Sequence, residues 1–456
     1  MSLFDGKRLP LSAFKLDAER MRRGWYSDKY FYNIVAVLTE LAKRGYRFGG
    51  TSPDLTDISV DLANLAIGDI EVEMQWFTRR TPFAVIVGVD KALAMLQSCT
   101  GYFEESTGWV DTFAKTEVVA VQDGSIVEYG GDAKHVKPVL KVKGRYRDFA
   151  LLETPTLGAL ARGTRVATNV YQVLEAARGK DVLFFPARFD AHEVQAADGY
   201  AYHIAVQAYN ARSGRTARSF VSTDEQGDWW GGAGGGTVAH AAIACFLGDT
   251  AETMLAFSSI LPASVPRIAL VDFHNDCVGT SLDVIEKMFR KYRERVDAND
   301  DEGAKKFVLY GVRPDTSGGL RDKSVEPLGD PVLDNGVNPR LCFALRKALD
   351  NAFETWDLPM RWMDRARQYC KNVKLTVTGG FNPARIRQFE AMNVPADVYG
   401  VGSSLFSHSV NDGTATDFTA DIVRVKIEGQ WHDLSKVGRQ NGENPALEAV
   451  QRLPVA

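Results

Sequence analysis

Residues 373–403 read VKLTVTGGFNPARIRQFEAMNVPADVYGVGS, and this stretch decides the fold class. The apolar run at 373–378 predicts a strand, and a second strand candidate covers 396–401. Between them, Asn382 and Pro383 are typical of the residue before a helix and of its first residue. A strand, a helix and a strand within roughly 30 residues predict a parallel βα unit.

The same alternation extends toward the N-terminus. RIALVDF at 267–273 and FVLYGV at 307–312 are further strand candidates, and between them Ser281 is placed to cap a helix with one apolar face. Strands and helices that alternate in this way predict an α/β fold, which could be a barrel or an open doubly wound sheet.

The two ends of the chain follow a different pattern. Residues 1–145 mix helix and strand signals, as in a small α+β domain, and Asp123-Gly124 within 116–129 is a hairpin signal. Near the C-terminus, 417–427 alternates like a strand of an antiparallel sheet, and we expect it to rejoin the N-terminal part. The predicted domains are an α+β domain of residues 1–145 plus 415–456 and a βα domain of residues 146–414.

The composition restricts the partners of the chain. With 54 basic and 58 acidic residues the formal net charge is −4, which excludes a general electrostatic attraction to nucleic acid. No stretch approaches the ~20 apolar residues that span a bilayer, and the N-terminus lacks the apolar core of a signal peptide. We therefore expect a cytoplasmic protein that binds neither nucleic acid nor membranes. The five cysteines are widely spaced and form no CxxC pair, which predicts reduced thiols.

Polar residues follow the predicted strands at the end where βα proteins place their functional groups. Asp272 lies at the end of the first of these strands, and Arg313, Asp315 and Ser317 follow the next. Arg313 could form a surface ion pair, or it could grip a planar carboxylate or a phosphate as a fork. Asp315 could serve ribose hydroxyls, a magnesium ion or a ring nitrogen. Asp272 could be a solvated loop residue or a magnesium ligand.

Glycines follow the last two predicted strands. Gly379 and Gly380 end one strand, and Gly400 and Gly402 with Ser403 end the other. Either group alone could simply form a tight turn. At successive strand ends they favour a phosphate site, because glycine lets backbone N–H groups approach an anion and serine adds a hydroxyl donor.

Two further clusters lie earlier in the chain. Arg188 follows an apolar run in FFPARFD, and Thr237 and His240 follow the glycine-rich stretch 231–236, which matches no nucleotide-binding fingerprint. A lone histidine such as His240 is often only structural. WYSDKYFY at 25–32 could be a helix entry, or it could offer a flat ring an aromatic surface with Asp28 or Tyr30 as its polar group.

In this order the motifs resemble the nicotinate phosphoribosyltransferase family of type II phosphoribosyltransferases. The segments that carry the resemblance cover most of the chain: YSDKYF, KVKGRYRDFALLET with VATN, FFPARFDAH, STDEQGDWWGGAGGGTVAHA, ALVDF, GVRPDTSGG, TGGF and VYGVGSSL. The resemblance implies an irregular, TIM-like βα barrel and a discontinuous α+β domain formed by both termini. It also implies a homodimer, or an assembly of dimers, with the active site at the subunit interface.

The resemblance assigns roles to several of the candidate residues. Tyr30, with Asp28 beside it, is expected to reach the pyridine ring from the partner chain. Arg313 is expected to hold the nicotinate carboxylate or an adjacent phosphate, Arg188 the pyrophosphate, and Asp315 the ribose. The 5-phosphate is expected to lie against Gly379, Gly380, Gly400, Gly402 and Ser403.

The implied reaction joins nicotinate to phosphoribosyl pyrophosphate, giving nicotinate mononucleotide and pyrophosphate for NAD biosynthesis. Magnesium is expected to accompany the pyrophosphate, and ATP is expected to phosphorylate His240, although Ala241 follows it where many members carry an acidic residue. Pro314 resembles the nicotinamide phosphoribosyltransferases, so a nicotinamide enzyme is one alternative. A phosphosugar enzyme on a similar barrel and a non-catalytic metabolite binder are the others. The sequence leaves the metal ligands unassigned.

Overall fold

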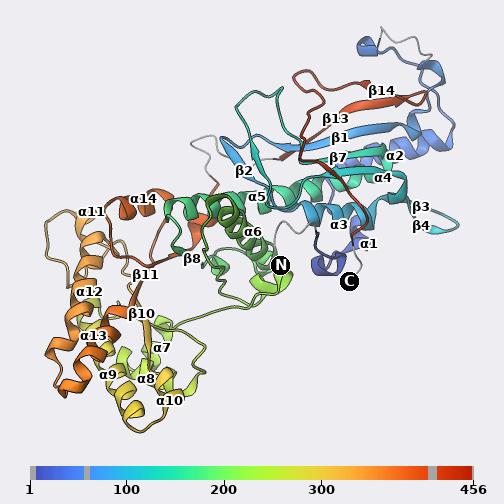
Figure 1. The fold of residues 1–456 in the computed structure, drawn as a ribbon. Helices are drawn as coiled ribbons and strands as arrows, with labels where there is room; N and C mark the ends of the chain where they lie inside the picture. Colours follow the sequence, from blue (N-terminus) through green and yellow to red (C-terminus); the bar gives the residue numbers. More distant parts are fainter. Residues whose placement is uncertain (1–6, 56–61, 409–417, 454–456) are drawn as a thin grey trace.

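The computed structural model describes residues 7–55, 62–408 and 418–453. Figure 1 shows two parts, each built on its own sheet, with the long helix α5 (Glu153–Ala176) between them. This helix packs against β13 of one sheet and against β8 and α14 beside the other, so it contacts both parts. No helix in the described ranges is long and apolar enough to cross a bilayer.

The first part holds an antiparallel sheet in the order β14-β13-β1-β7-β5-β15. Its strands are Glu71–Thr78 (β1), Glu117–Ala120 (β5), Leu140–Arg145 (β7), Phe418–Ile427 (β13), Gln430–Asp433 (β14) and Glu448–Ala449 (β15). Val72 of β1 lies opposite Val425 of β13, so strands from the two ends of the chain are neighbours. The predicted domain boundary at 414/415 lies outside the described residues, and the domain limits stay a prediction.

Short helices and two small strand pairs surround this sheet. The helices are Ala18–Arg22 (α1), Lys29–Lys43 (α2), Val89–Cys99 (α3) and Tyr146–Phe149 (α4). The strand pairs are Phe83–Val85 (β2) with Ile126–Glu128 (β6), and Gly101–Glu104 (β3) with Gly108–Asp111 (β4).

The hairpin predicted at Asp123-Gly124 is wrong. The strands on either side of it pair elsewhere, β5 with β7 and β6 with β2. The Asp123 carboxylate instead accepts the backbone N–H of Val89 at 2.8 Å, at the start of α3. Long-range strand pairing and this buried hydrogen bond outweigh the local turn preference.

The core of the first part centres on Trp76 of β1, which is 1% exposed. Every residue of β1 after Glu71 is buried, so the strand is covered on both faces. The Trp76 indole donates to the Thr156 hydroxyl at 3.1 Å, and this hydrogen bond joins the sheet to α5.

The second part holds a parallel sheet in the order β8-β12-β11-β10-β9. Its strands are Asp181–Phe184 (β8), Arg267–Leu270 (β9), Leu309–Arg313 (β10), Lys374–Val377 (β11) and Val398–Val401 (β12). Its helices are Gln195–Ser213 (α6), His240–Cys245 (α7), Thr250–Ile260 (α8), Cys277–Asp297 (α9), Asp301–Lys305 (α10), Pro331–Asp334 (α11), Pro339–Asn351 (α12), Met363–Asn372 (α13) and Pro383–Ala391 (α14). The predicted mixture of parallel strands and helices is confirmed.

The expected barrel is not seen as a closed ring of strands in the described ranges. Beyond β8, the sheet continues only through single bridges from Phe184 to Val221 and from Val221 to Gly234. The chain then runs to Val238, whose carbonyl accepts a hydrogen bond from Arg313 of β10. Apart from the bridge at Gly234, residues 231–238 form no strand that would join β8 to β9, the other edge strand.

One helix start follows its local sequence signal, and another does not. Asn382 caps α14 by accepting the N–H of Arg385 at 3.0 Å, and Pro383 is its first residue, as predicted. The cap predicted at Ser281 is wrong, because α9 already begins at Cys277 and its cap is Asp276. Ser281 lies buried inside this helix.

Candidate active site

The carboxyl ends of the parallel strands open onto a cavity of about 800 Å³. Most of the predicted site residues line this cavity: Arg188, Thr237, His240, Arg313, Asp315, Gly379, Gly380, Gly400, Gly402 and Ser403. These residues come from segments far apart in the chain. The parallel sheet brings them together because its strands all end at one edge.

Arg313 is the last residue of β10 and lies partly buried in the cavity wall. Its Nη2 donates to the Val238 carbonyl at 3.2 Å, while its buried Nε has no acceptor in the described part of the chain. Burial lowers the pKa of this guanidinium, whereas Asp315 and Asp272 raise it. Arginine stays charged at neutral pH, so Arg313 offers an anion a positive charge with unused donors.

His240 and Asp272 form a pair at the side of the cavity. The His240 Nε2 lies 3.0 and 3.1 Å from the two carboxylate oxygens of Asp272. Asp272 does not line the cavity itself, and its side chain is 9% exposed against 46% for His240. Burial raises the pKa of Asp272, and His240 counteracts this shift. The carboxylate therefore fixes the ring of His240 and leaves Nδ1 as its other nitrogen.

Asp315 is tied to the neighbouring strand end by Thr378. The Thr378 hydroxyl donates to Asp315 Oδ1 at 2.7 Å, and the Thr378 N–H donates to the Pro314 carbonyl at 3.3 Å. Thr378 is 6% exposed. This contact orients the Asp315 carboxylate toward the cavity and links the loops that follow β10 and β11.

The two predicted glycine groups lie on the same cavity. Gly379 and Gly380 adopt φ values of 95° and 69°, which favour glycine. An added Cβ at Gly400 would lie 2.5 Å from Cγ2 of the buried Thr378, so this position favours glycine for packing. An added Cβ at Gly402 would lie 2.7 Å from Cε2 of the exposed Phe189, whose ring would have to move.

Two runs of backbone N–H groups in these glycine loops donate to no acceptor within the described residues. The first run is Gly379, Gly380 and Phe381, and the second is Gly402, Ser403 and Ser404. Since unpaired backbone donors around a hollow bind anions, these loops are suited to a phosphate group.

Arg188 and two aromatic rings line the cavity beside Gly400 and Gly402. Arg188 is exposed, lies 5.4 Å from the centroid of the Phe189 ring and forms no ion pair in the described ranges. Phe185, which follows β8, also lines the cavity. This wall can hold a flat ring beside a second anion.

Ser317, Asp28 and Tyr30 do not line the cavity. Ser317 is exposed and its hydroxyl accepts the Gly319 N–H at 3.4 Å. Asp28 and Tyr30 lie at the start of α2, where Asp28 contacts the first turn of α5. The Tyr30 hydroxyl donates to Asp28 at 3.1 Å, as does the Thr154 hydroxyl. A contact of Tyr30 with substrate stays a prediction that needs a second chain.

Glu153 lies beside Asp28 and has an unusual pKa. Burial, with help from Asp421 and Asp28, raises its pKa from the ordinary 4.5 to about 8. The folded state therefore binds a proton that the unfolded state loses, so stability falls as pH rises from about 4.5 to about 8.

We expect the Glu153→Gln substitution to remove this loss of stability at high pH. At pH 9 the free energy of unfolding of the variant should exceed that of the wild type by about 2 kcal/mol, a value reduced because part of the carboxylate is solvated. At pH 5 the difference should be much smaller. Urea titrations at both pH values measure the difference. An equal difference at pH 5 and pH 9 would contradict the assignment.

Several residues of the cavity escaped the sequence prediction. Thr378, Phe185, Phe189 and Asn382 line it. Phe185 and Phe189 flank Arg188 in FFPARFD, so their place in this motif was the available signal. Thr378 looks like an ordinary strand residue, and only the sheet register places it beside Asp315.

The carboxylates suit a magnesium ion that arrives with phosphate. Asp315 lines the cavity and Asp272 lies behind His240. In the ranges that the structure describes, no three His, Cys, Asp or Glu side chains gather as they would around a resident metal ion. Magnesium takes oxygen ligands and keeps water or phosphate among them, so one or two carboxylates suffice.

Comparisons with known proteins agree with this architecture. Residues 54–164 match the family model described as the quinolinate phosphoribosyl transferase N-terminal domain. A nicotinate-nucleotide pyrophosphorylase from Pyrococcus furiosus is 23% identical with a TM-score of 0.59, over 96% of this chain and 85% of that one. Human nicotinic acid phosphoribosyltransferase is 14% identical with a TM-score of 0.50, over 89% of this chain and 75% of that one. No curated protein matches the sequence.

These likenesses concern the fold, because both identities are low, while the family model covers the N-terminal part alone. The ordered motifs of the sequence add the site residues, most of which the structure gathers at one cavity. The matched N-terminal domain and the shared fold agree with the resemblance of the motifs to the type II phosphoribosyltransferases.

Proposed function

We propose that this chain transfers the phosphoribosyl group of phosphoribosyl pyrophosphate to the ring nitrogen of nicotinate in NAD biosynthesis. One observation carries the proposal. A partly buried arginine with an unused donor, Arg313, shares a cavity with two loops of unpaired backbone N–H groups. The cavity thus offers one site for a carboxylate and another for a phosphate.

In the proposed reaction the lone pair of the pyridine nitrogen forms a bond to ribose C1. The bond from C1 to pyrophosphate breaks, and its electrons leave with the pyrophosphate. Positive charge builds up on the ribose in the transition state, so no nucleophilic side chain is needed. Asp315, oriented by Thr378, faces the ribose, and Arg188 stabilises the departing pyrophosphate. Magnesium would neutralise part of the pyrophosphate charge.

We propose that His240 accepts a phosphoryl group from ATP. Its Nε2 faces Asp272, so the opposite nitrogen is the one that could accept a phosphoryl group. A phosphate on His240 would stand at the side of the cavity, because His240 lines it. Hydrolysis of that phosphate would drive the transfer forward.

We further propose a cytoplasmic homodimer, or an assembly of dimers. Asp28 and Tyr30 lie outside the cavity of their own chain. They would meet the pyridine ring only in the cavity of a partner subunit, which fits the sequence-based expectation for this tyrosine.

Quinolinate is a second candidate substrate, favoured by the match of residues 54–164. It carries two carboxylates, whereas only Arg188 and Arg313 are arginines of the cavity lining in the described ranges. If Arg188 holds the pyrophosphate, a single arginine remains for the pyridine. Nicotinate, with one carboxylate, then fits this chain better.

The test measures product formation by mass spectrometry. Purified protein receives phosphoribosyl pyrophosphate and magnesium with nicotinate, nicotinamide or quinolinate, each with and without ATP. We expect nicotinate mononucleotide from nicotinate, formed faster with ATP. The His240→Ala variant should retain the basal rate and lose the effect of ATP.

Three other results would change the substrate, the role of His240 or the reaction itself. A preference for nicotinamide or quinolinate would change the substrate and keep the reaction. Stimulation by ATP that survives in His240→Ala would remove His240 from the coupling. Transfer to none of the three pyridines would overturn the proposed function.

A further inference from the structure

Arg385, on the first turn of α14, bridges two loops of the candidate site. Its Nη1 donates to the Gly379 carbonyl at 2.6 Å and its Nη2 to the Val337 carbonyl at 2.7 Å. The guanidinium also lies 4.4 Å from the centroid of the Phe381 ring. Arg385 is partly buried, forms no ion pair in the described ranges and does not line the cavity. Its two donors therefore serve the backbone of the protein itself.

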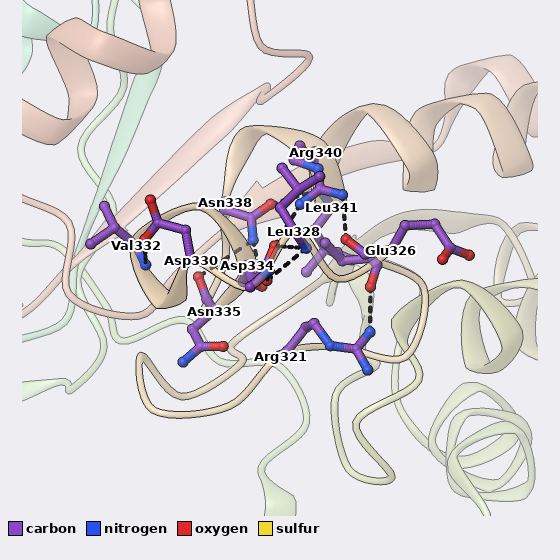
Figure 2. Close-up of polar contacts among 12 residues, drawn as sticks. Arg321, Glu326, Leu328, Asp330, Val332, Asp334, Asn335, Asn338, Arg340 and Leu341 are labelled. Carbon is purple, nitrogen blue, oxygen red and sulfur yellow. Dashed lines mark hydrogen bonds and ion pairs between the residues drawn. The ribbon is translucent and has the colours of Figure 1, made fainter.

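The acceptor on the far side, Val337, belongs to a loop that is fixed by its own hydrogen bonds. Figure 2 shows Asp334, the last residue of α11, at the centre of these contacts. Its carboxylate accepts the N–H of Leu328 at 2.9 Å and Arg340 Nη1 at 2.7 Å. The Asn338 side chain, next to Val337, donates to the Asp334 carbonyl at 2.9 Å. The Val337 carbonyl is thus a stable anchor for Arg385.

The other acceptor, Gly379, belongs to the loop proposed to bind phosphate. A peptide group is planar, and its C=O and N–H point in opposite directions. Since the Gly379 carbonyl turns toward Arg385, the N–H of Gly380 in the same peptide group points away from Arg385. Gly379 and Gly380 line the cavity whereas Arg385 does not, so this N–H is directed to the cavity side.

The conformation of this loop needs support. Gly379 and Gly380 both have positive φ, and glycine has the largest conformational freedom in the absence of restraints. Two charge-assisted hydrogen bonds from one rigid guanidinium restrict the Gly379 peptide relative to the fixed Val337 loop. A lysine could keep the charge but would not span both carbonyls with one planar group.

We infer that Arg385 is a positioning residue, which holds the Gly379–Gly380 turn so that its backbone N–H groups bind the 5-phosphate of the ribose substrate. The inference rests on the phosphate subsite of the proposed function. It assigns Arg385 no contact with the substrate.

The experiment compares the full-length wild type with Arg385→Met, which keeps a long side chain and removes the donors. The control is Arg387→Met, which alters an exposed arginine two residues further along α14. Binding of ribose 5-phosphate is measured by calorimetry, and KM for each substrate, kcat and Tm are measured in parallel.

For Arg385→Met we expect about tenfold weaker binding of ribose 5-phosphate and a similar rise in KM for phosphoribosyl pyrophosphate. KM for the pyridine, kcat and Tm should change little, and Arg387→Met should match the wild type. Arg385→Lys should fall between wild type and Arg385→Met. This variant keeps the test decisive if Arg385→Met does not fold.

Unchanged binding of ribose 5-phosphate in both Arg385 variants would overturn the inference. So would a parallel rise of both KM values with a lower Tm, which indicates a general structural role. Absence of ribose 5-phosphate binding in the wild type would overturn it too. If the wild type binds ribose 5-phosphate and Arg385→Met does not, the inference holds even where transfer to every pyridine fails, so the two proposals fail separately.

Discussion

The Arg313→Ala variant is expected to lose about 10³-fold in kcat/KM for nicotinate, with phosphoribosyl pyrophosphate saturating. The substitution removes the charge proposed to hold the carboxylate in a partly buried cavity, and such truncations cost about 2–5 kcal/mol. It also leaves Asp315 and Asp272 without the cation beside them, which adds repulsion toward any anion. Initial rates over a range of nicotinate concentrations measure the loss.

Two comparisons identify what Arg313 holds. Arg313→Lys keeps the charge without the planar fork, and we expect it to retain more activity than the alanine variant. Nicotinamide carries no carboxylate, so its transfer should suffer far less from Arg313→Ala than that of nicotinate. An equal loss for both pyridines would instead assign Arg313 to a phosphate. Nearly unchanged rates would exclude Arg313 from the site.

The largest expected effect on stability belongs to Trp76→Ala. Trp76 is 1% exposed, and replacing a buried tryptophan by alanine costs about 3–5 kcal/mol through lost contacts and the cavity that remains. The variant also leaves the Thr156 hydroxyl without the indole that donates to it. Urea unfolding followed by circular dichroism gives the change in the free energy of unfolding.

Trp76→Phe is the matched control, because it keeps an aromatic ring and removes the indole N–H. We expect it to lose about 1–2 kcal/mol, mainly from the hydrogen bond to Thr156 and the smaller volume. A loss below about 1 kcal/mol for Trp76→Ala would show that the joint between the sheet and α5 tolerates repacking.

The elements predicted correctly from the sequence are those whose signals are local. The start of α14 is an example, since Asn382 and Pro383 act within one turn of the helix. Asp123-Gly124 carries an equally local signal for a hairpin, yet distant partners for β5 and β6 decide the pairing. The closed ring of strands was expected from the resemblance, and the glycine-rich residues 231–236 do not form the strands that it requires.

The same difference between local signals and long-range contacts applies to the candidate site. Arg313, Asp315 and the glycine groups were predictable because parallel strands place their ends at one edge. Thr378 and Arg385 were not, since their roles depend on which loops the sheet brings together. Asp28 and Tyr30 lie apart from the cavity of their chain, and a sequence alone gives no distance between two subunits.

The pairing of β1 with β13 sets an order for folding during synthesis. The ribosome makes Val72 long before Val425, its neighbour in the sheet. Until then, one edge of β1 has no partner strand, and exposed edges of this kind invite aggregation. The strands β8 to β12 all emerge earlier than β13, so the parallel sheet can form first. The nascent chain therefore completes its first part last, and residues 71–78 keep one unpaired strand edge until β13 is made.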